Sequence, residues 1–317
     1  TRTASRLKQL ADEFGVQRVY TDYNELLANP EVEAVSITTM WDQHTAPALT
    51  ALKAGKHVFL EKPMASTVEQ AETLVEAARR GGLAYVVGYM RRHDEGIALA
   101  KETLLALVAS GELGPITFVR AHVFGGDAYY KIDGHVTTTE TVPAATTTWP
   151  IAPAWLPEEF HKDYAWFINV YCHNLNLLRF LFGKTPTVRH VELENKAARL
   201  IVLGFGDFVA TLEAGWMTHL GWDDVTEIYF ANGWLRIDAP AALLRNVPCR
   251  VTLYKGKARD GAHELRTESS WAFRRQAEAF VRSVATRTEP VASGADALLD
   301  MRLAEEIWRM HLAIRGG

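Results

Sequence analysis

Apolar residues follow two alternating spacings along the first 95 residues, which indicates helices and strands in regular succession. Runs that repeat every three to four residues predict helices, and short continuous apolar runs between them predict buried strands. Strands that alternate with helices are typical of a parallel sheet covered on both faces. The expected strands are 32–38, 57–60 and 83–88, and the expected helices are 6–14, 22–27, 42–54 and 67–80.

The pattern changes after about residue 96 to long β-branched and aromatic runs with less helix between them. We therefore expect an α/β domain over residues 1–95 and an α+β domain with a mostly antiparallel open sheet over 96–317, the C-terminal helix packing back on the first domain. A proline- and threonine-rich stretch, 137–157, predicts an irregular loop. The expected strands are 116–124, 188–193, 200–203, 208–216, 227–230, 234–237 and 250–254, and the expected helices are 97–110, 165–182, 271–284 and 297–314.

The composition restricts the classes of molecule that this chain could bind. The 317 residues are 48% hydrophobic and carry a formal charge of -4 without any basic block, which argues against nucleic acid or an anionic membrane. No apolar run reaches the roughly 18 residues that a membrane span needs. The two cysteines form no disulfide framework or metal knuckle, so a reducing cytoplasm and a small-molecule ligand fit best.

Polar residues follow each strand of the predicted parallel sheet, at the edge where such sheets bind ligands. Thr38, Thr39, Trp41 and His44 follow the first strand, Glu61 and Lys62 the second, and Tyr89, Arg91 and Arg92 the third. Any one of these segments could be an ordinary loop, but three at one edge favour a site. Lys62 is the sharpest candidate, because an ammonium held beside a proline can hydrogen-bond a substrate hydroxyl or a developing alkoxide. A salt-bridged surface lysine is the alternative, and the Lys62–Pro63 bond could be cis.

A second candidate lies in the strongly apolar helix 165–182, where Asn169, His173 and Asn176 share one face. A satisfied core histidine is the alternative to a cleft wall. Histidine can take the proton of an alcohol as it is oxidised. Asn169 can orient the imidazole but cannot stabilise its charged form. Asp127, Tyr129 and Trp155 could border the same cleft, and tryptophans such as Trp166 and Trp216 could stack on sugars or simply fill the core. The histidines are scattered, so no metal is expected.

These residues, in this order, resemble the Gfo/Idh/MocA family of NAD(P)-dependent oxidoreductases, which act on sugars, inositols and related polyols. The most specific part is Ala54-Gly55-Lys56-His57-Val58 leading into Glu61-Lys62-Pro63. Three other segments support it over nearly the whole chain: Tyr20-Thr21-Asp22-Tyr23, Gly88-Tyr89-Met90-Arg91-Arg92 and His173-Asn174-Leu175-Asn176-Leu177-Leu178-Arg179.

The resemblance implies a Rossmann-like first domain, an NAD or NADP cofactor and a sugar-like substrate. Lys62 would then lie beside nicotinamide and substrate, and the family's Asp-x-x-x-His pair would fall on Asn169 and His173. Asn169 departs from the family's Asp, which puts the family's proton relay in doubt. The family's opening strand, Gly-rich phosphate turn, helix and second strand are also missing, so we expect about one β-α-β unit of roughly 30 residues before Thr1.

Three functions follow as hypotheses. The first is hydride transfer between NAD(P) and a hydroxyl or ketone of a sugar, glycoside or cyclitol, with His173 exchanging the proton, Lys62 polarising the oxygen, and Asn169 and Asn176 orienting the substrate. The second is a cofactor-assisted non-redox sugar enzyme of lyase, glycosidase or epimerase type, and the third is a non-catalytic regulator or partner subunit. We also expect a homo-oligomer, dimer or tetramer, through an apolar open face of the second sheet. That face would carry Val191, Leu193, Ile201, Leu203, Phe205 and Val209.

Overall fold

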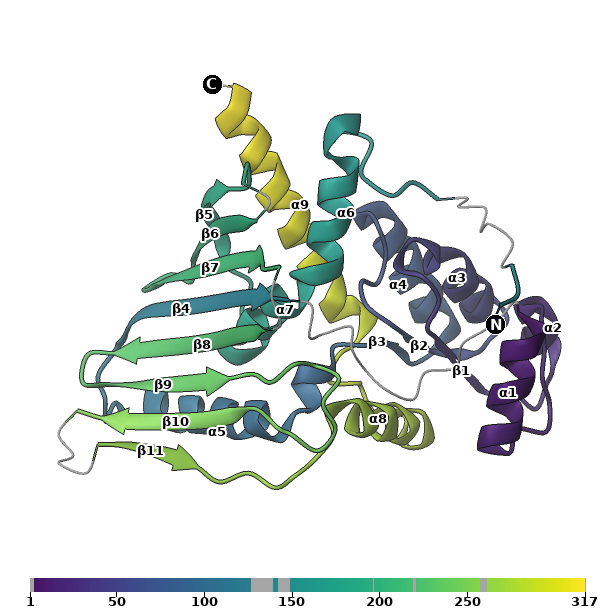
Figure 1. Ribbon diagram of the computed structural model, residues 1–317, viewed down its shortest axis with the longest axis horizontal. Coiled ribbons are helices and arrows are strands. Elements are labelled where there is room, and N and C mark those ends of the chain that lie inside the picture. Colours follow the sequence, from purple (N-terminus) through teal and green to yellow (C-terminus); the bar gives the residue numbers. More distant parts are fainter. Residues whose placement is uncertain are drawn as a thin grey trace.

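Two sheets with helices between and around them make up the chain (Figure 1). The computed structural model describes residues 3–126, 139–141, 149–195, 197–218, 221–256 and 261–316. A three-stranded parallel sheet belongs to the first part of the sequence, and an eight-stranded mixed sheet belongs to the rest. The predicted fold class, a Rossmann-like parallel sheet followed by an α+β part, is confirmed.

The parallel sheet has the order β1-β2-β3, with β1 at Ala34–Ile37, β2 at His57–Leu60 and β3 at Tyr85–Val87. Helices α3 (Thr45–Lys53) and α4 (Val68–Gly81) connect these strands. The Thr67 hydroxyl accepts the Gln70 N–H at the start of α4, and Gly82 ends this helix in the left-handed conformation that glycine tolerates best. Helices α1 (Ala4–Phe14) and α2 (Tyr23–Ala28) lie at the β1 end of the sheet (Figure 1).

The larger sheet has the order β11-β10-β9-β8-β4-β7-β6-β5. All its neighbouring strands are antiparallel except β4 and β7, which run in parallel. Its strands are β4 (Ile116–Gly125), β5 (Thr187–Glu192), β6 (Ala198–Gly204), β7 (Val209–Trp216), β8 (Trp222–Phe230), β9 (Gly233–Asp238), β10 (Arg250–Lys255) and β11 (Ala262–Leu265).

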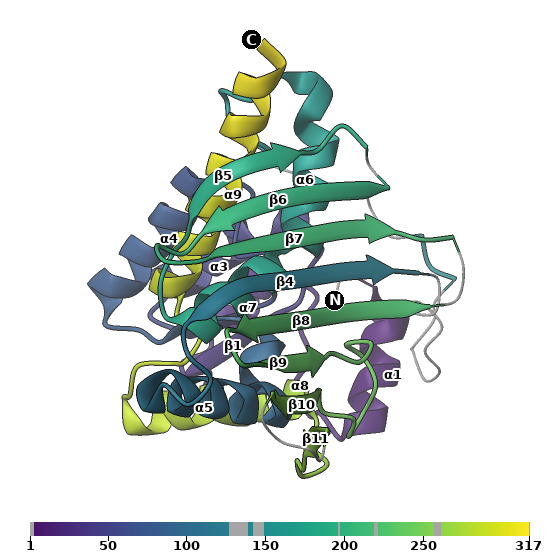
Figure 2. The same ribbon diagram turned by 90° about the vertical axis from the view of Figure 1, so that its left-hand side faces the viewer.

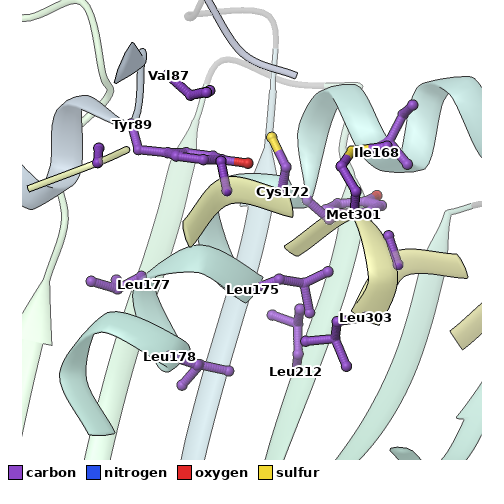
Figure 3. Packing of buried hydrophobic residues seen from close by; sticks show 14 of the residues in the cluster. Val87, Tyr89, Ile168, Cys172, Leu175, Leu177, Leu178, Leu212, Met301 and Leu303 are labelled. Carbon is purple, nitrogen blue, oxygen red and sulfur yellow. The ribbon is translucent and has the colours of Figure 1, made fainter. Parts of the chain in front are cut away.

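The remaining helices join the two sheets into one packed core. They are α5 (Glu95–Ser110), α6 (His161–Val170), α7 (Cys172–Phe182), α8 (Ala272–Thr286) and α9 (Gly294–Gly316). Helix α9 contacts α4 on one side and β5 on the other, and its fully buried Trp308 meets Phe167 of α6 edge to face. Side chains from β3, α7, β7 and α9 share the same interior, as Val87, Leu175, Leu212 and Leu303 show (Figure 3). A shared apolar core holds the two sheets in a fixed relation.

The open face of the large sheet differs from our expectation (Figure 2). Five of the six residues predicted to form an apolar surface point into the core instead, namely Val191, Leu193, Ile201, Leu203 and Phe205, and only Val209 is exposed. The open face carries ion pairs such as Arg120 with Glu213, and Arg236 with Glu227. Five of the six residues were therefore assigned to the wrong side of the sheet, because alternation along a strand separates its two sides without saying which side helices cover.

Three element boundaries were also mispredicted. The helix expected at 165–182 is two helices, α6 and α7, with Tyr171 between them. Strand β8 begins five residues before the expected 227, at Trp222, and the polar strand β11 was not predicted at all. The first difference changes the site, since the helix break exposes the Asn169 oxygen, and the second adds Asp224 to the buried network behind it.

Candidate active site

The ends of the three parallel strands are level, which brings their loops together. Ile37 pairs with Leu60, and Leu60 pairs with Val87, so the segments that begin at Thr38, Glu61 and Gly88 leave the sheet at one edge. The sequence predicted this edge as the ligand-binding edge. The side chains of Thr38 and Thr39 are exposed there, and that of Trp41 is partly exposed.

Lys62 reaches across from the β2 loop to helix α6. Its ammonium donates hydrogen bonds to the Asn169 backbone oxygen at 2.6 Å and to Asn169 Oδ1 at 3.2 Å. Its backbone N–H donates to Glu61 Oε2 at 3.2 Å, and the Lys62–Pro63 peptide bond is cis. Among the described residues the ammonium therefore binds neutral oxygens rather than a carboxylate.

Glu61 lies against the start of the third loop. A Cβ atom added at Gly88 would lie 3.0 Å from Glu61 Oε1, so a larger residue there would push on the Glu61 carboxylate. Burial raises the pKa of Glu61, and the neighbouring Lys62 opposes that shift. Glu61 thus supports the backbone of Lys62 from beneath the β2 loop.

The break between α6 and α7 explains how a backbone oxygen becomes available to Lys62. The Tyr171 N–H donates to Phe167, as in a continuing helix, but the N–H groups of Asn174 and Leu175 both donate to the Tyr171 oxygen. The Asn169 oxygen lies just before this irregular turn and accepts from Lys62 Nζ. Carbonyl oxygens at a helix end lack an intrahelical donor, so they can bind other groups.

His173 stands on the first turn of α7, with its ring against the edge of Tyr89 at 6.2 Å between centroids. Its Nδ1 is buried and has no hydrogen-bond partner in the described part of the chain. Burial lowers the pKa of His173 well below its usual value, and the positive charges of Lys62 and Arg91 lower it further. His173 is consequently neutral near pH 7, and a neutral imidazole can accept a proton.

Tyr89 lies against His173 on the buried side of the candidate site. Its side chain is almost completely buried, and its hydroxyl points into the space beside Cys172 (Figure 3). The hydroxyl has no hydrogen-bond partner among the residues that the structure describes. Burial raises the pKa of Tyr89 far above its usual range, so the hydroxyl keeps its proton and remains a donor.

Arg91 and Arg92, predicted to bind the cofactor, point away from the ligand edge into the junction of the two sheets. Arg91 pairs with Asp224 of β8, which also accepts from Asn174. Arg92 donates to Asn176 Oδ1 at 2.8 Å and to the Val291 oxygen. Because both guanidinium groups are buried and bound to internal acceptors, we reassign them to structural support.

Asn176 belongs to the same buried network and not to a substrate surface. Its Nδ2 donates to Asp300 Oδ2 at 2.7 Å, and Asp300 also accepts from Arg179. The side chain is almost fully buried, and burial raises the pKa of Asp300 while Arg179 opposes the shift. The predicted polar stripe is thus divided: Asn169 and His173 contribute to the site, and Asn176 fixes α7 on α9.

Two further residues that were predicted to line the site, Trp155 and His44, do not face a ligand in the structure. Trp155 donates from Nε1 to Glu305 of α9 and stacks beneath the Arg309 guanidinium at 3.9 Å, so it covers a helix rather than a substrate. His44 is buried between two backbone oxygens and cannot face a cofactor. Asp127 and Tyr129 lie outside the described residues.

The sequence reasoning missed the buried carboxylates Asp224 and Asp300, which pair with Arg91 and Arg179 respectively. Asp224 occupies an inward position of β8, but the predicted strand began three residues after it. Asp300 lies one turn into the predicted C-terminal helix, among apolar residues. An acidic residue on the apolar side of a strand or helix is the signal that could have shown them, since such residues are buried only when paired.

No cluster of three or more histidine, cysteine or acidic side chains within the described ranges of the sequence could hold a metal ion. None of the described helices is long and apolar enough to cross a membrane.

Comparisons with known proteins agree with this architecture. Residues 1–89 match the model of an oxidoreductase family with an NAD-binding Rossmann fold. Inositol 2-dehydrogenase of Salmonella typhimurium is 35% identical over 113 residues, which is 35% of this chain and 32% of the relative. The chain thus matches about a third of the length of such relatives. The scyllo-inositol 2-dehydrogenase (NAD(+)) of Bacillus subtilis is 25% identical over 94% of this chain and 81% of its own length.

Solved structures resemble the whole chain. Aldose-aldose oxidoreductase from Caulobacter crescentus has a TM-score of 0.74 at 22% identity, covering 99% of this chain and 88% of that one. Levoglucosan dehydrogenase in complex with NADH and levoglucosan has a TM-score of 0.75 at 17% identity, covering 98% and 86%. At these identities the likeness establishes the fold alone.

Proposed function

We propose that this chain, whose residues 1–89 belong to the Gfo/Idh/MocA oxidoreductase family, moves a hydride between NAD(P) and a hydroxyl-bearing carbon of a sugar or cyclitol. One observation carries the proposal. At the carboxyl edge of the parallel sheet, the Lys62 ammonium binds only neutral oxygens among the described residues and lies near enough to His173 to lower the pKa of that imidazole. A cation beside a neutral base is what alcohol oxidation needs.

In this proposal residues 1–95 hold the nucleotide and residues 96–317 provide the substrate side and the C-terminal helix. The exposed side chains of Thr38 and Thr39, with Trp41 beside them, fit a cofactor at this edge. The glycine at position 88 keeps the third loop close to Glu61, and the β1 and β2 loops leave the sheet beside it. When bound, the nicotinamide accepts or supplies the hydride.

The chain's own residues handle the proton and the oxygen. His173 takes the proton of the substrate hydroxyl during oxidation and returns it during reduction. Lys62 donates a hydrogen bond to the same oxygen, which stabilises the negative charge that develops there. The Asn169 amide and backbone oxygen orient the Lys62 ammonium. Asn169 carries no charge, so protonated His173 receives no stabilisation from a carboxylate at this position.

A ring-shaped polyol is the substrate class that we favour. Inositol and anhydro-sugar dehydrogenases occur among the similar proteins. Trp166, one helical turn before Asn169, is 38% exposed and meets Trp216 edge to face with 5.8 Å between ring centroids. The edge-to-face contact with Trp216 restricts the orientation of the indole. An exposed, fixed indole suits the C–H face of a sugar ring.

The test is turnover of a small polyol panel by the purified protein with NAD+ and with NADP+. The panel contains scyllo-inositol, myo-inositol and levoglucosan, and reduced nicotinamide is followed by absorbance. We expect net accumulation of reduced cofactor with at least one polyol. Binding of cofactor without redox change across the panel would contradict the proposal and favour a regulatory role.

A second candidate is a cofactor-assisted reaction without net redox change. Asn169 favours it, because the position that would charge-stabilise protonated His173 is neutral. Product formation without lasting accumulation of reduced nicotinamide in the same assay would support this candidate over the first.

A further inference from the structure

We propose that His44 is a positioning residue that ties the β1 loop to the β2 loop and thereby fixes the direction of Lys62. The inference rests on the proposed function, in which Lys62 is the group that touches substrate. His44 itself has no route to a ligand, because its side chain is only 1% exposed.

The imidazole lies between the two loops and contacts a backbone oxygen of each. Nδ1 is 2.8 Å from the Pro63 oxygen, and Nε2 is 3.1 Å from the Thr39 oxygen. The residue occupies the N-cap position of α3, directly after the short 3₁₀ turn Trp41–Gln43. A single buried ring therefore spans the loop beside the expected cofactor and the loop that carries Lys62.

The two contacts are not equivalent. A neutral imidazole has one N–H group, so it can donate to only one of the two oxygens. Burial and the charge of Lys62 lower the pKa of His44, whereas both backbone contacts and Asp42 raise it, and burial is the largest effect. The lowered pKa favours the neutral ring, and we assign its single proton to Nδ1 because the contact with Pro63 is the shorter of the two. In this tautomer the Pro63 oxygen accepts a hydrogen bond, whereas Nε2 and the Thr39 oxygen are both acceptors and form none.

A hydrogen bond to the Pro63 oxygen fixes the backbone immediately after Lys62. On the preceding side, the Lys62 N–H donates to Glu61 and the Glu61 N–H donates to the Ile37 oxygen. On the following side, His44 holds Pro63, and Met64 and Ala65 are fully buried. The backbone of Lys62 is thus fixed from both directions, which leaves its side chain aimed at Asn169. A displacement of about 1 Å in such a group can cost a hundredfold in rate.

The test compares two amide replacements. In His44→Asn the amide nitrogen takes the place of Nδ1 and can still donate to Pro63, whereas in His44→Gln it takes the place of Nε2 and reaches toward Thr39. We expect His44→Gln to lower kcat about 10- to 100-fold more than His44→Asn. The KM for the polyol should differ little between the two variants.

His57→Gln is the matched control. His57 is another histidine of the parallel sheet whose ring nitrogen contacts the backbone, since its Nδ1 accepts the Ala84 N–H at 2.9 Å, but it lies at the opposite end of β2. This variant should lower the melting temperature without changing kcat. Equal kcat values for the two His44 variants, with only their melting temperatures reduced, would show that His44 merely fills the core.

Amide hydrogen exchange provides a readout that needs no turnover. The amides of residues 64–66 should exchange faster in His44→Gln than in His44→Asn, and 15N spectra of labelled histidine should show the His44 proton on Nδ1. Unchanged exchange in 64–66 would overturn the proposal. If the wild-type protein turns over no polyol, the exchange result still decides the role of His44, and only the proposed function fails.

Discussion

The loops after β2 and β3 leave the same edge of the same sheet and carry equally basic residues, yet the structure uses them differently. Lys62 of the β2 loop binds neutral oxygens of Asn169. Arg91 and Arg92 of the β3 loop turn inward to the carboxylates Asp224 and Asp296. A cation without a carboxylate can act on a ligand, whereas a paired and buried cation holds the fold together.

The difference follows from what faces each loop. Opposite β2 is the break between α6 and α7, which offers backbone and amide oxygens. Opposite β3 lie β8 and the first turn of α9, which offer Asp224 to Arg91 and Asp296 to Arg92. The partners of a basic residue, rather than its place on the ligand edge, decide whether it belongs to the active site.

The largest effect is expected from breaking the buried ion pair between Arg91 of the β3 loop and Asp224. Arg91→Met should lower the free energy of unfolding by about 3–5 kcal/mol, because it leaves the buried Asp224 carboxylate without its cation. Chemical denaturation measures this loss. The double variant Arg91→Met with Asp224→Leu should recover most of it. A loss below about 1 kcal/mol for the single variant would show that the pair is not the support described above.

The next largest effect is expected from replacing Lys62 in the loop after β2. Lys62→Met should lower kcat about 10²- to 10³-fold, because the donor to the developing alkoxide is lost. The denaturation midpoint should stay close to that of the wild type, since the side chain is only partly buried. Lys53→Met, which removes an exposed lysine of α3, is the control and should keep full activity. Wild-type activity in Lys62→Met would remove this residue from the mechanism.

A smaller effect, on the pH dependence of kcat/KM, is expected from placing a carboxylate at position 169. Oxidation needs neutral His173, and its pKa is lowered, so the acid limb of kcat/KM should lie below pH 6.5 in the wild type. Asn169→Asp should raise that pKa by about 1 unit or more, because a nearby negative charge favours the imidazolium. The limb should therefore move to higher pH. A limb that stays in place would mean that another group is the base.

The smallest effect is expected far from both loops. Arg120 and Glu213 form an ion pair with two hydrogen bonds on the open face of the large sheet, where Arg120 is exposed and Glu213 is partly exposed. Arg120→Ala should change the free energy of unfolding by about 0.2–1 kcal/mol and leave kcat unchanged. A larger loss, measured by denaturation, would indicate that this face is covered in solution.

Sequence periodicity predicted the fold well because helices and strands repeat at different spacings. Strand ends and one helix face pointed to Lys62 and Asn169, which the structure joins by hydrogen bonds. The inward turn of Arg91 could not be predicted, since its partner Asp224 lies 133 residues away. The break at Tyr171 also gave no signal, because the apolar pattern continues through it. The open face was misjudged because the pattern of a strand does not identify its covered side.

Hydride transfer at the Lys62–His173 site can be measured directly by following a deuterium label. The protein is incubated with oxidised cofactor and a cyclitol deuterated at its ring carbons, and the reduced cofactor is analysed by mass spectrometry. We predict deuterium on the nicotinamide with the wild-type protein and a strongly reduced rate of its appearance with Lys62→Met. Reduced cofactor without deuterium, or equal rates in both proteins, would contradict the central claim.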